Sequence, residues 1–234
     1  MNVRVGTSGF SFDEWKGVFY PEGLKPAERL RYYAQRFRSV EVNNTFYQMP
    51  KAEVLARWKD ETPETFVFVL KASQRITHRE RLKDSAASVE RFFENAAALG
   101  AKQGPTLYQL PPQFKKDAAR LASFLELLGG RPGAFEFRHA SWMDEEVFAL
   151  LRSHGAALCS ADMDESGEEG APLVPTADWG YLRLRRADYS PEALRAWAGR
   201  IQGLGWRDAY VFFKHEVKGP ALASDFEAAC RANP

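Results

Sequence analysis

The stretch GYLRLRR, residues 180 to 186, is an apolar, β-rich run whose last residues are basic. Polar groups at the carboxyl ends of many strands are typical of the ligand face of a parallel-strand barrel or an open α/β sheet. A core strand has no structural need for such groups, since burying them is costly unless they are paired. Five other runs share the arrangement: SVEVNNTFY (39 to 47), FVFVLK (66 to 71), PTLYQLPP (105 to 112), GAFEFRH (133 to 139) and AYVFFKH (209 to 215).

Helix-like segments alternate with these runs. VRVG (3 to 6) and AALCSAD (156 to 162) read as two further strands, which brings the predicted number to eight. The order predicts an α/β fold, a TIM-barrel-like (β/α)₈ single domain over residues 1–234. The first expected helix starts at about Pro26. The others cover residues 51 to 60, 85 to 99, 117 to 128, 144 to 153, 191 to 202 and 219 to 231.

One unit departs from this repeat. Residues 162 to 178, DMDESGEEGAPLVPTAD, are rich in Gly, Pro and acidic residues, so a loop is expected in place of the sixth helix. A doubly wound sheet is the alternative fold, but it needs about six strands and would leave two runs unexplained.

The composition is that of a globular, cytoplasmic protein. Hydrophobic residues make up 45% of the 234 residues, which is enough for a substantial core. Lys and Arg number 32 against 31 acidic residues, so no general attraction to nucleic acid or acidic membranes is expected. Cys159 and Cys230 lack metal-ligand spacing and are expected to be free thiols in a reducing compartment. No stretch is apolar enough to span a bilayer.

Polar residues at alternate positions near the strand ends form the candidate site. Side chains two residues apart on a strand point to the same face, and helices cover the outer face of a barrel. These side chains are therefore expected to point inward. A neutralised network that only fills the barrel is the alternative, but contributions from seven strands favour a functional pocket. The candidates are Glu41, Asn43, Lys71, Gln109, Glu136, Arg138, Asp162, Tyr181, Arg183, Arg185 and Lys214.

The basic candidates point to an anionic ligand. Arg offers a planar fork to carboxylate or phosphate, and Lys adds a point charge. Asn43 and Gln109 are assigned to the same substrate-binding group. Glu41, Glu136 and Asp162 could instead hold a divalent metal, but nearby cations oppose it and no HxH or HExxH pattern occurs, so no metal ligand is assigned. The basic residues of the group are Lys71, Arg138, Arg183, Arg185 and Lys214.

Proton transfer is assigned to Glu41 or Glu136, with His139 as partner. His78, His139 and His215 all follow strand ends, where an imidazole with an ordinary pKa near ~6.5 suits acid–base chemistry. For each His, a hydrogen-bonded structural role is the alternative.

An aromatic loop follows the first strand. Phe10, Phe12, Trp15, Phe19 and Tyr20 lie within eleven residues, a density that fits a lid or a stacking platform. The alternative is a satellite core that closes the end of the barrel. Two aromatic residues are assigned to substrate binding, Trp15 and Tyr47.

At these residues the chain resembles the YecE-like family, domain-of-unknown-function family 72. The resemblance runs from residue 5 to about 186. It implies a TIM-barrel-like fold with a polar pocket at one end, and it carries no established reaction. The matching blocks are VGTSGFSFDEWKGVFYPEGL, VEVNNTFYQMP, ITHRERLKD, LYQLPPQF, EFRHASW and TADWGYLRLR.

Three functions fit these observations. The first is an enzyme, hydrolase- or lyase-like, that acts on a small anionic or phosphorylated polar substrate. The second is a module that binds nucleic acid or a sugar phosphate without reaction. The third is a metal-dependent barrel nuclease or isomerase. The sequence specifies no cofactor, reaction or oligomeric state.

Overall fold

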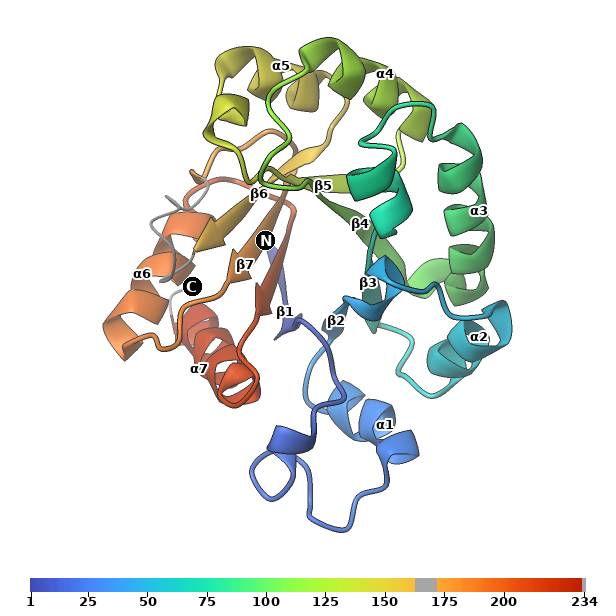
Figure 1. The fold of residues 1–234 in the computed structure, drawn as a ribbon. Coiled ribbons are helices and arrows are strands. Elements are labelled where there is room, and N and C mark those ends of the chain that lie inside the picture. The colour runs from blue at the N-terminus through green and yellow to red at the C-terminus, as the bar shows by residue number, and fades with distance from the viewer. Residues whose placement is uncertain (163–171, 233–234) are drawn as a thin grey trace.

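The computed structural model describes residues 1–162 and 172–232. Eight parallel strands lie side by side in the order β1-β8-β7-β6-β5-β4-β3-β2. A bridge between Ser8 and Glu41 brings the two outer strands together, so the sheet curls into a nearly closed barrel (Figure 1). The strands are β1 (Asn2–Thr7), β2 (Ser39–Val42), β3 (Val67–Lys71), β4 (Gln103–Gln109), β5 (Gly133–Glu136), β6 (Ala157–Asp162), β7 (Trp179–Leu184) and β8 (Asp208–Phe213).

Helices surround the strands on the outside (Figure 1). This arrangement confirms the predicted TIM-barrel-like fold, and the pairing of β1 with β8 excludes the doubly wound sheet. The loop predicted in place of the sixth helix falls mostly on residues 163–171, outside the described residues, and residues 172–178 contain no helix. The helices are α1 (Arg29–Ala34), α2 (Ala52–Asp60), α3 (Ala86–Ala96), α4 (Ala118–Leu128), α5 (Glu145–Ser153), α6 (Pro191–Gln202) and α7 (Gly219–Ala232).

Helix starts follow the capping residues in the sequence. Asp117 accepts a hydrogen bond from the backbone N–H of Arg120 at the start of α4, and Asp144 accepts one from Glu146 at the start of α5. Each side chain satisfies a backbone donor that has no partner inside the helix, which stabilises the helix by about 1 kcal/mol. The predicted starts of both helices are therefore confirmed.

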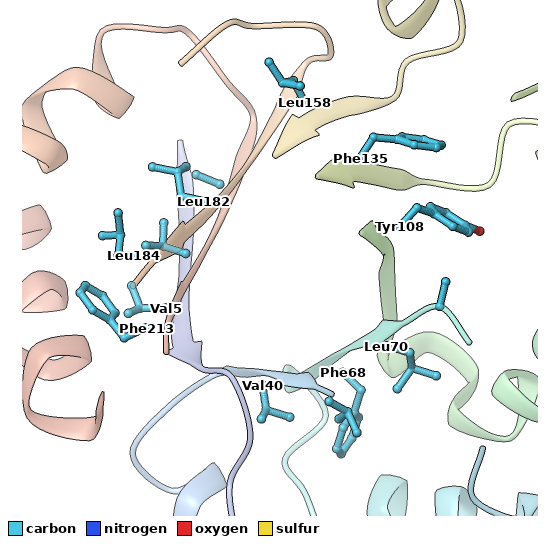
Figure 2. Packing of buried hydrophobic residues seen from close by; sticks show 14 of the residues in the cluster. Val5, Val40, Phe68, Leu70, Tyr108, Phe135, Leu158, Leu182, Leu184 and Phe213 are labelled. Carbon is cyan, nitrogen blue, oxygen red and sulfur yellow. The ribbon is translucent and has the colours of Figure 1, made fainter. Parts of the chain in front are cut away.

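Alternation along the strands separates an outer core from an inner one. Figure 2 shows apolar side chains such as Val40, Leu70 and Leu182 pointing away from the barrel axis, toward the helices. Residues at the alternate positions pack together inside the barrel. This inner cluster consists of Val69, Leu107, Ala134, Ala157, Cys159, Trp179, Tyr181 and Phe212. Side chains two residues further along the inner face of several strands are polar, and they continue the inner cluster toward the carboxyl end of the barrel.

The seam between β1 and β2 depends on close approach. A Cβ atom added to Gly6 would lie 2.0 Å from the backbone oxygen of Ser39, so only glycine fits there. The buried hydroxyl of Tyr33 accepts from the backbone N–H of Thr7 at 2.8 Å and donates to the oxygen of Ser39 at 3.0 Å. Tyr33 thus bridges the two strands beside the incomplete ladder and fixes the part of β2 that leads to Glu41.

Cys159 is buried and Cys230 is half-buried, and both are free thiols as predicted. Within the described ranges, no helix combines the length and apolar character needed to cross a bilayer.

Candidate functional site

Arg183 of β7 joins three strands across the carboxyl end of the barrel. Its Nη1 donates to Oε2 of Glu136 on β5 at 2.6 Å, and its Nη2 donates to Oε1 of Glu41 on β2 at 2.9 Å. The Arg183 side chain is only 1% exposed. A buried charge is tolerated when opposite charges and hydrogen bonds compensate it, and the two carboxylates provide both. The predicted convergence of these three side chains is therefore observed.

The carboxylate of Glu41 is held by further donors. Tyr181, two residues before Arg183 on the same face of β7, donates its hydroxyl to Oε2 at 2.6 Å. Asn43 donates from Nδ2 to Oε1 at 3.1 Å. Burial raises the pKa of Glu41, but Arg183 and hydrogen bonds that include the one from Tyr181 lower it more, so the net shift is downward.

The carboxylate of Glu136 leads to a lysine through an amide. Gln109 lies opposite Glu136 in the ladder between β4 and β5, and its Nε2 donates to Oε1 at 2.8 Å. Its own Oε1 accepts from Nζ of Lys71 at 2.7 Å. Burial raises the pKa of Glu136, but the charges of Arg183 and Arg185 outweigh burial and lower the pKa to about 2. Both carboxylates are therefore anions at neutral pH.

Lys71, at the end of β3, has the opposite character. It is 9% exposed, and its Nζ lies 4.2 Å from the centre of the Phe46 ring. Burial and the nearby charge of Arg183 lower the pKa of Lys71 to about 8, although Glu136 and Glu41 act against this shift. Among the buried residues of this network, Lys71 thus has the pKa nearest to neutral pH.

Three more basic side chains lie at the rim of this network. Arg138 is half-buried, and Nη1 of Arg185 lies 3.8 Å from the carboxylate of Glu136. Burial and the charge of Arg183 lower the pKa of Arg185; burial, Arg185 and Arg183 lower the pKa of Lys214. With Lys71 and Arg183, five basic groups therefore lie at the carboxyl end of the barrel, here called the mouth, together with two buried carboxylates, Glu41 and Glu136.

Of the three histidines that follow strands, His139 and His215 cap short segments, and His78 lies near Lys71. Nδ1 of His139 accepts from the backbone N–H of Ser141 at 3.1 Å, which caps the short helix Ala140–Trp142. His215 accepts from the N–H of Lys218 at 3.0 Å, near the start of α7. These contacts match the structural alternative for both rings, and the assignment of His139 to catalysis stays a prediction.

His78 lies on the Lys71 side of the site and shares a contact with it. Its ring packs edge-on against Phe46, with centres 4.8 Å apart, and Phe46 also contacts the lysine. Burial and the charges of Lys71 and Arg138 lower the pKa of His78.

The backbone conformation around His78 could not be predicted from the sequence. Residues Arg75–Arg79 form a single π-helical turn, and Arg81, Leu82 and Asp84 then adopt positive φ angles between 50° and 67°. π-turns and such strained residues are enriched at functional sites. The only signal in the sequence was the ITHRERLKD block, which carries the family resemblance but does not indicate a conformation.

The aromatic loop packs as the satellite core that was the alternative to a lid. Trp15 is 1% exposed, donates from Nε1 to the backbone oxygen of Glu216 at 2.6 Å, and packs against Phe12 and Phe19. Substrate contact by Trp15 would require the loop to open, and this assignment stays a prediction. Tyr47, in contrast, is 74% exposed and is available for contact.

The three-carboxylate metal site does not form. Asp162 pairs through Oδ1 with Nε of Arg186 at 2.9 Å, and the guanidinium of Arg183 lies between Glu41 and Glu136. Among the residues that the structure describes, no group of three or more His, Cys, Asp or Glu is placed to hold a metal ion. The metal-dependent alternative therefore lacks the ligand set on which it depended.

Comparisons with known sequences agree with one another. A family model described as a protein of unknown function, DUF72, matches residues 4–234. The UPF0759 protein YunF of Bacillus subtilis (strain 168) is 27% identical over 226 residues, which is 91% of this chain and 78% of that protein. The UPF0759 protein YecE of Escherichia coli (strain K12) is 34% identical over 136 residues, which is 58% of this chain and 46% of that protein.

Solved structures of other proteins have the same barrel fold. The crystal structure of a DUF72 family protein from Thermotoga maritima has a TM-score of 0.87 and 31% identity, and the match covers 99% of this chain and 100% of that chain. A DUF72 family protein from Enterococcus faecalis has a TM-score of 0.80 at 18% identity, covering 98% and 95% of the two chains. At that identity the second likeness shows the fold alone.

Proposed function

The chain belongs to the DUF72 family of proteins of unknown function, and we propose that it is an enzyme that acts on a small anionic or phosphorylated substrate at the carboxyl end of its barrel. The proposed reaction is hydrolase- or lyase-like. In TIM-barrel enzymes the active site lies at this end, built from residues that follow the strands.

The crowding of cations at the mouth is the observation that supports this proposal. Two carboxylates already compensate Arg183, yet Lys71, Arg185 and Lys214 lie in the same space, and each has a lowered pKa. Burial is the largest cause of all three shifts, and the positive charge of Arg183 adds to each of them. A network that only filled the barrel would gain nothing from this excess of positive charge. An anionic ligand would relieve it.

The residues divide into two groups under this proposal. Glu41 and Glu136, held as anions by Arg183, would orient the guanidinium and accept hydrogen bonds. Glu136, with a pKa of about 2, is a poor proton donor at neutral pH. Arg138, Arg185 and Lys214 would bind the anionic part of the substrate. Such preorganised charge typically contributes several kcal/mol of transition-state stabilisation.

Thermal unfolding with inorganic phosphate, sugar phosphates, small carboxylic acids and short oligonucleotides tests the proposal. A ligand that binds only the folded state at about 100 times its Kd adds about 2.7 kcal/mol, enough to raise Tm by several degrees. We expect stabilisation by small anions, and turnover of at least one of them. Stabilisation by oligonucleotides alone, with a steep salt dependence, would instead support the binding module.

The control variant is Arg231→Gln, which removes one positive charge from the last turn of α7. Its side chain is well exposed and pairs with Glu227 on the same helix. Stabilisation by phosphate should be the same in this variant as in the wild type. Lys214→Gln should reduce the stabilisation by phosphate. If the two variants lose this stabilisation equally, the anion is not bound at the mouth.

A further inference from the structure

Two lysine side chains are buried in the described part of the chain, and they differ in their partners. Nζ of Lys102 donates to the backbone oxygens of Lys59 at 2.6 Å and Thr62 at 2.7 Å, and it lies 3.7 Å from the carboxylate of Glu64. An ammonium group carries three donors. These three oxygens surround the Lys102 amine and give it a structural role.

Lys71 has neutral partners instead. Its Nζ donates to the side-chain oxygen of Gln109 at 2.7 Å and lies over the ring of Phe46 at 4.2 Å. The amide of Gln109 stands between the amine and the carboxylate of Glu136. Within the described residues no carboxylate forms an ion pair with this amine. Glu136, whose charge still favours the ammonium form, is hydrogen-bonded to Arg183 instead.

Burial and neighbouring cations give this amine a population without its proton. A pKa of about 8 leaves about a tenth of the molecules with a neutral Lys71 at pH 7. An ordinary lysine is neutral in about one molecule in three thousand at that pH. A neutral amine carries a free electron pair and is a nucleophile, and desolvation beside another cation is one known way to activate lysine.

We propose that the Lys71 amine reacts with the carbonyl carbon of an anionic aldehyde, ketone or 2-keto acid to form an imine. The nitrogen–carbon bond forms as the amine's electron pair adds to the carbonyl. The carbonyl oxygen then leaves as water with the two hydrogens of the amine. No oxidant or reductant is needed, and hydrolysis of the imine restores the lysine.

This inference deepens the proposed function and rests on it, because the same rim must bind the anionic part of the substrate. Arg138, Arg185 and Lys214 supply that charge, while Lys71 lies deeper, at the end of β3. The imine nitrogen, once protonated, attracts electrons from a neighbouring carbon. The lyase-like branch of the proposed reaction, in which a bond at that carbon breaks, is therefore the branch favoured here.

Borohydride trapping tests the proposal directly. The wild-type protein is incubated with pyruvate, dihydroxyacetone phosphate or glyceraldehyde 3-phosphate, and sodium borohydride then reduces any imine to a stable secondary amine. Peptide mapping by mass spectrometry locates the adducts. We expect at least a tenfold excess of adduct at Lys71 over Lys102, which serves as an internal buried reference. Lys71→Arg should lose the adduct, and the exposed control Arg231→Gln should keep it.

The outcomes separate this proposal from the one beneath it. If small anions stabilise the protein but no carbonyl compound gives an adduct at Lys71, the imine is excluded and the proposed function stands. If no anion stabilises the protein, the proposed function fails as well. Adducts spread evenly over exposed lysines would also overturn the imine, and this readout uses the wild type, so it does not depend on the folding of Lys71→Arg.

Discussion

Arg183 lies between two buried carboxylates. Its removal would take the ion-pair partner from Glu41 and leave Glu136 with the more distant Arg185. We expect Arg183→Leu to lower the free energy of unfolding by about 3–5 kcal/mol, the usual cost of breaking a buried ion pair from one side. Urea denaturation measures this change. Arg231→Gln, at an exposed position, should stay within about 0.5 kcal/mol of the wild type. An equally small effect of Arg183→Leu would contradict the central place of the guanidinium.

Glu136 makes stability depend on pH in a defined window. Its pKa is lowered from 4.5 to about 2 in the folded protein, so the folded state holds fewer protons than the unfolded state between these values. The stabilisation is complete above about pH 4.5 and is lost as the pH falls toward 2, with a total of about 3 kcal/mol. Glu136→Gln should have a shallower loss of stability from pH 5 to 2, measured by urea denaturation across that range. Parallel curves for the two proteins would show that Glu136 does not titrate as its contacts require.

Lys71 should impose its own pH dependence on imine formation. Its pKa in the folded protein is about 8, below the ordinary value of 10.5. The fraction of neutral amine therefore rises around pH 8 and not around pH 10.5. The initial rate of borohydride-trapped adduct at Lys71 should therefore rise about tenfold from pH 6 to 7 and level off above 8. Labelling of exposed lysines in the same digest should keep rising beyond pH 9. A Lys71 profile that follows those exposed lysines would show that burial does not activate the amine.

The inward direction of the strand-end residues could be predicted from the sequence, whereas their pairing could not. Alternation along β2, β5 and β7 requires only a period of two, so Glu41, Glu136 and Arg183 were expected on one face. Which carboxylate meets which base depends on barrel closure and on the register between strands far apart in the chain. The same reason hid Phe46 and His78, because their contact joins segments after β2 and β3 that have no local signal.

The aromatic loop after β1 shows the limit of composition as a guide to function. A dense run of aromatic residues fits a lid and a satellite core equally well on the basis of sequence. The long-range hydrogen bond from Trp15 to Glu216 favours the core, and that contact spans most of the chain. Helix ends, in contrast, were predictable at Asp117 and Asp144 because capping acts within three residues.

Closure between β1 and β2 should be sensitive to a single methyl group. A Cβ on Gly6 would lie 2.0 Å from the backbone oxygen of Ser39, so Gly6→Ala must push the strands apart. We expect a loss of at least about 2 kcal/mol in urea denaturation, as for other overpacked sites. Gly23→Ala is the matched control, because no atom lies within 4 Å of the added carbon. If both variants unfold at the same urea concentration, the seam is more tolerant than its geometry indicates.

The molecule as a whole is almost neutral, with a formal charge of +1, whereas five basic side chains gather with two buried carboxylates at the carboxyl end of the barrel. Such local concentration of like charge opposes folding slightly and favours an anionic ligand. Proteins often keep features of this kind, which cost stability, where function requires them. Charge at the rim therefore gives a test that distinguishes a functional site from a network that only fills the barrel.

The double variant Arg185→Gln and Lys214→Gln applies this test. Both groups have lowered pKa values, so their surroundings disfavour the charges that the variant removes. We expect the Tm of the ligand-free protein to stay equal or to rise, while stabilisation by phosphate falls at least tenfold in apparent affinity. Scanning calorimetry with and without phosphate measures both quantities on the same samples. A variant that is less stable when free and binds phosphate as before would assign these two cations to structural support, and the anionic-substrate proposal would lose the observation that supports it.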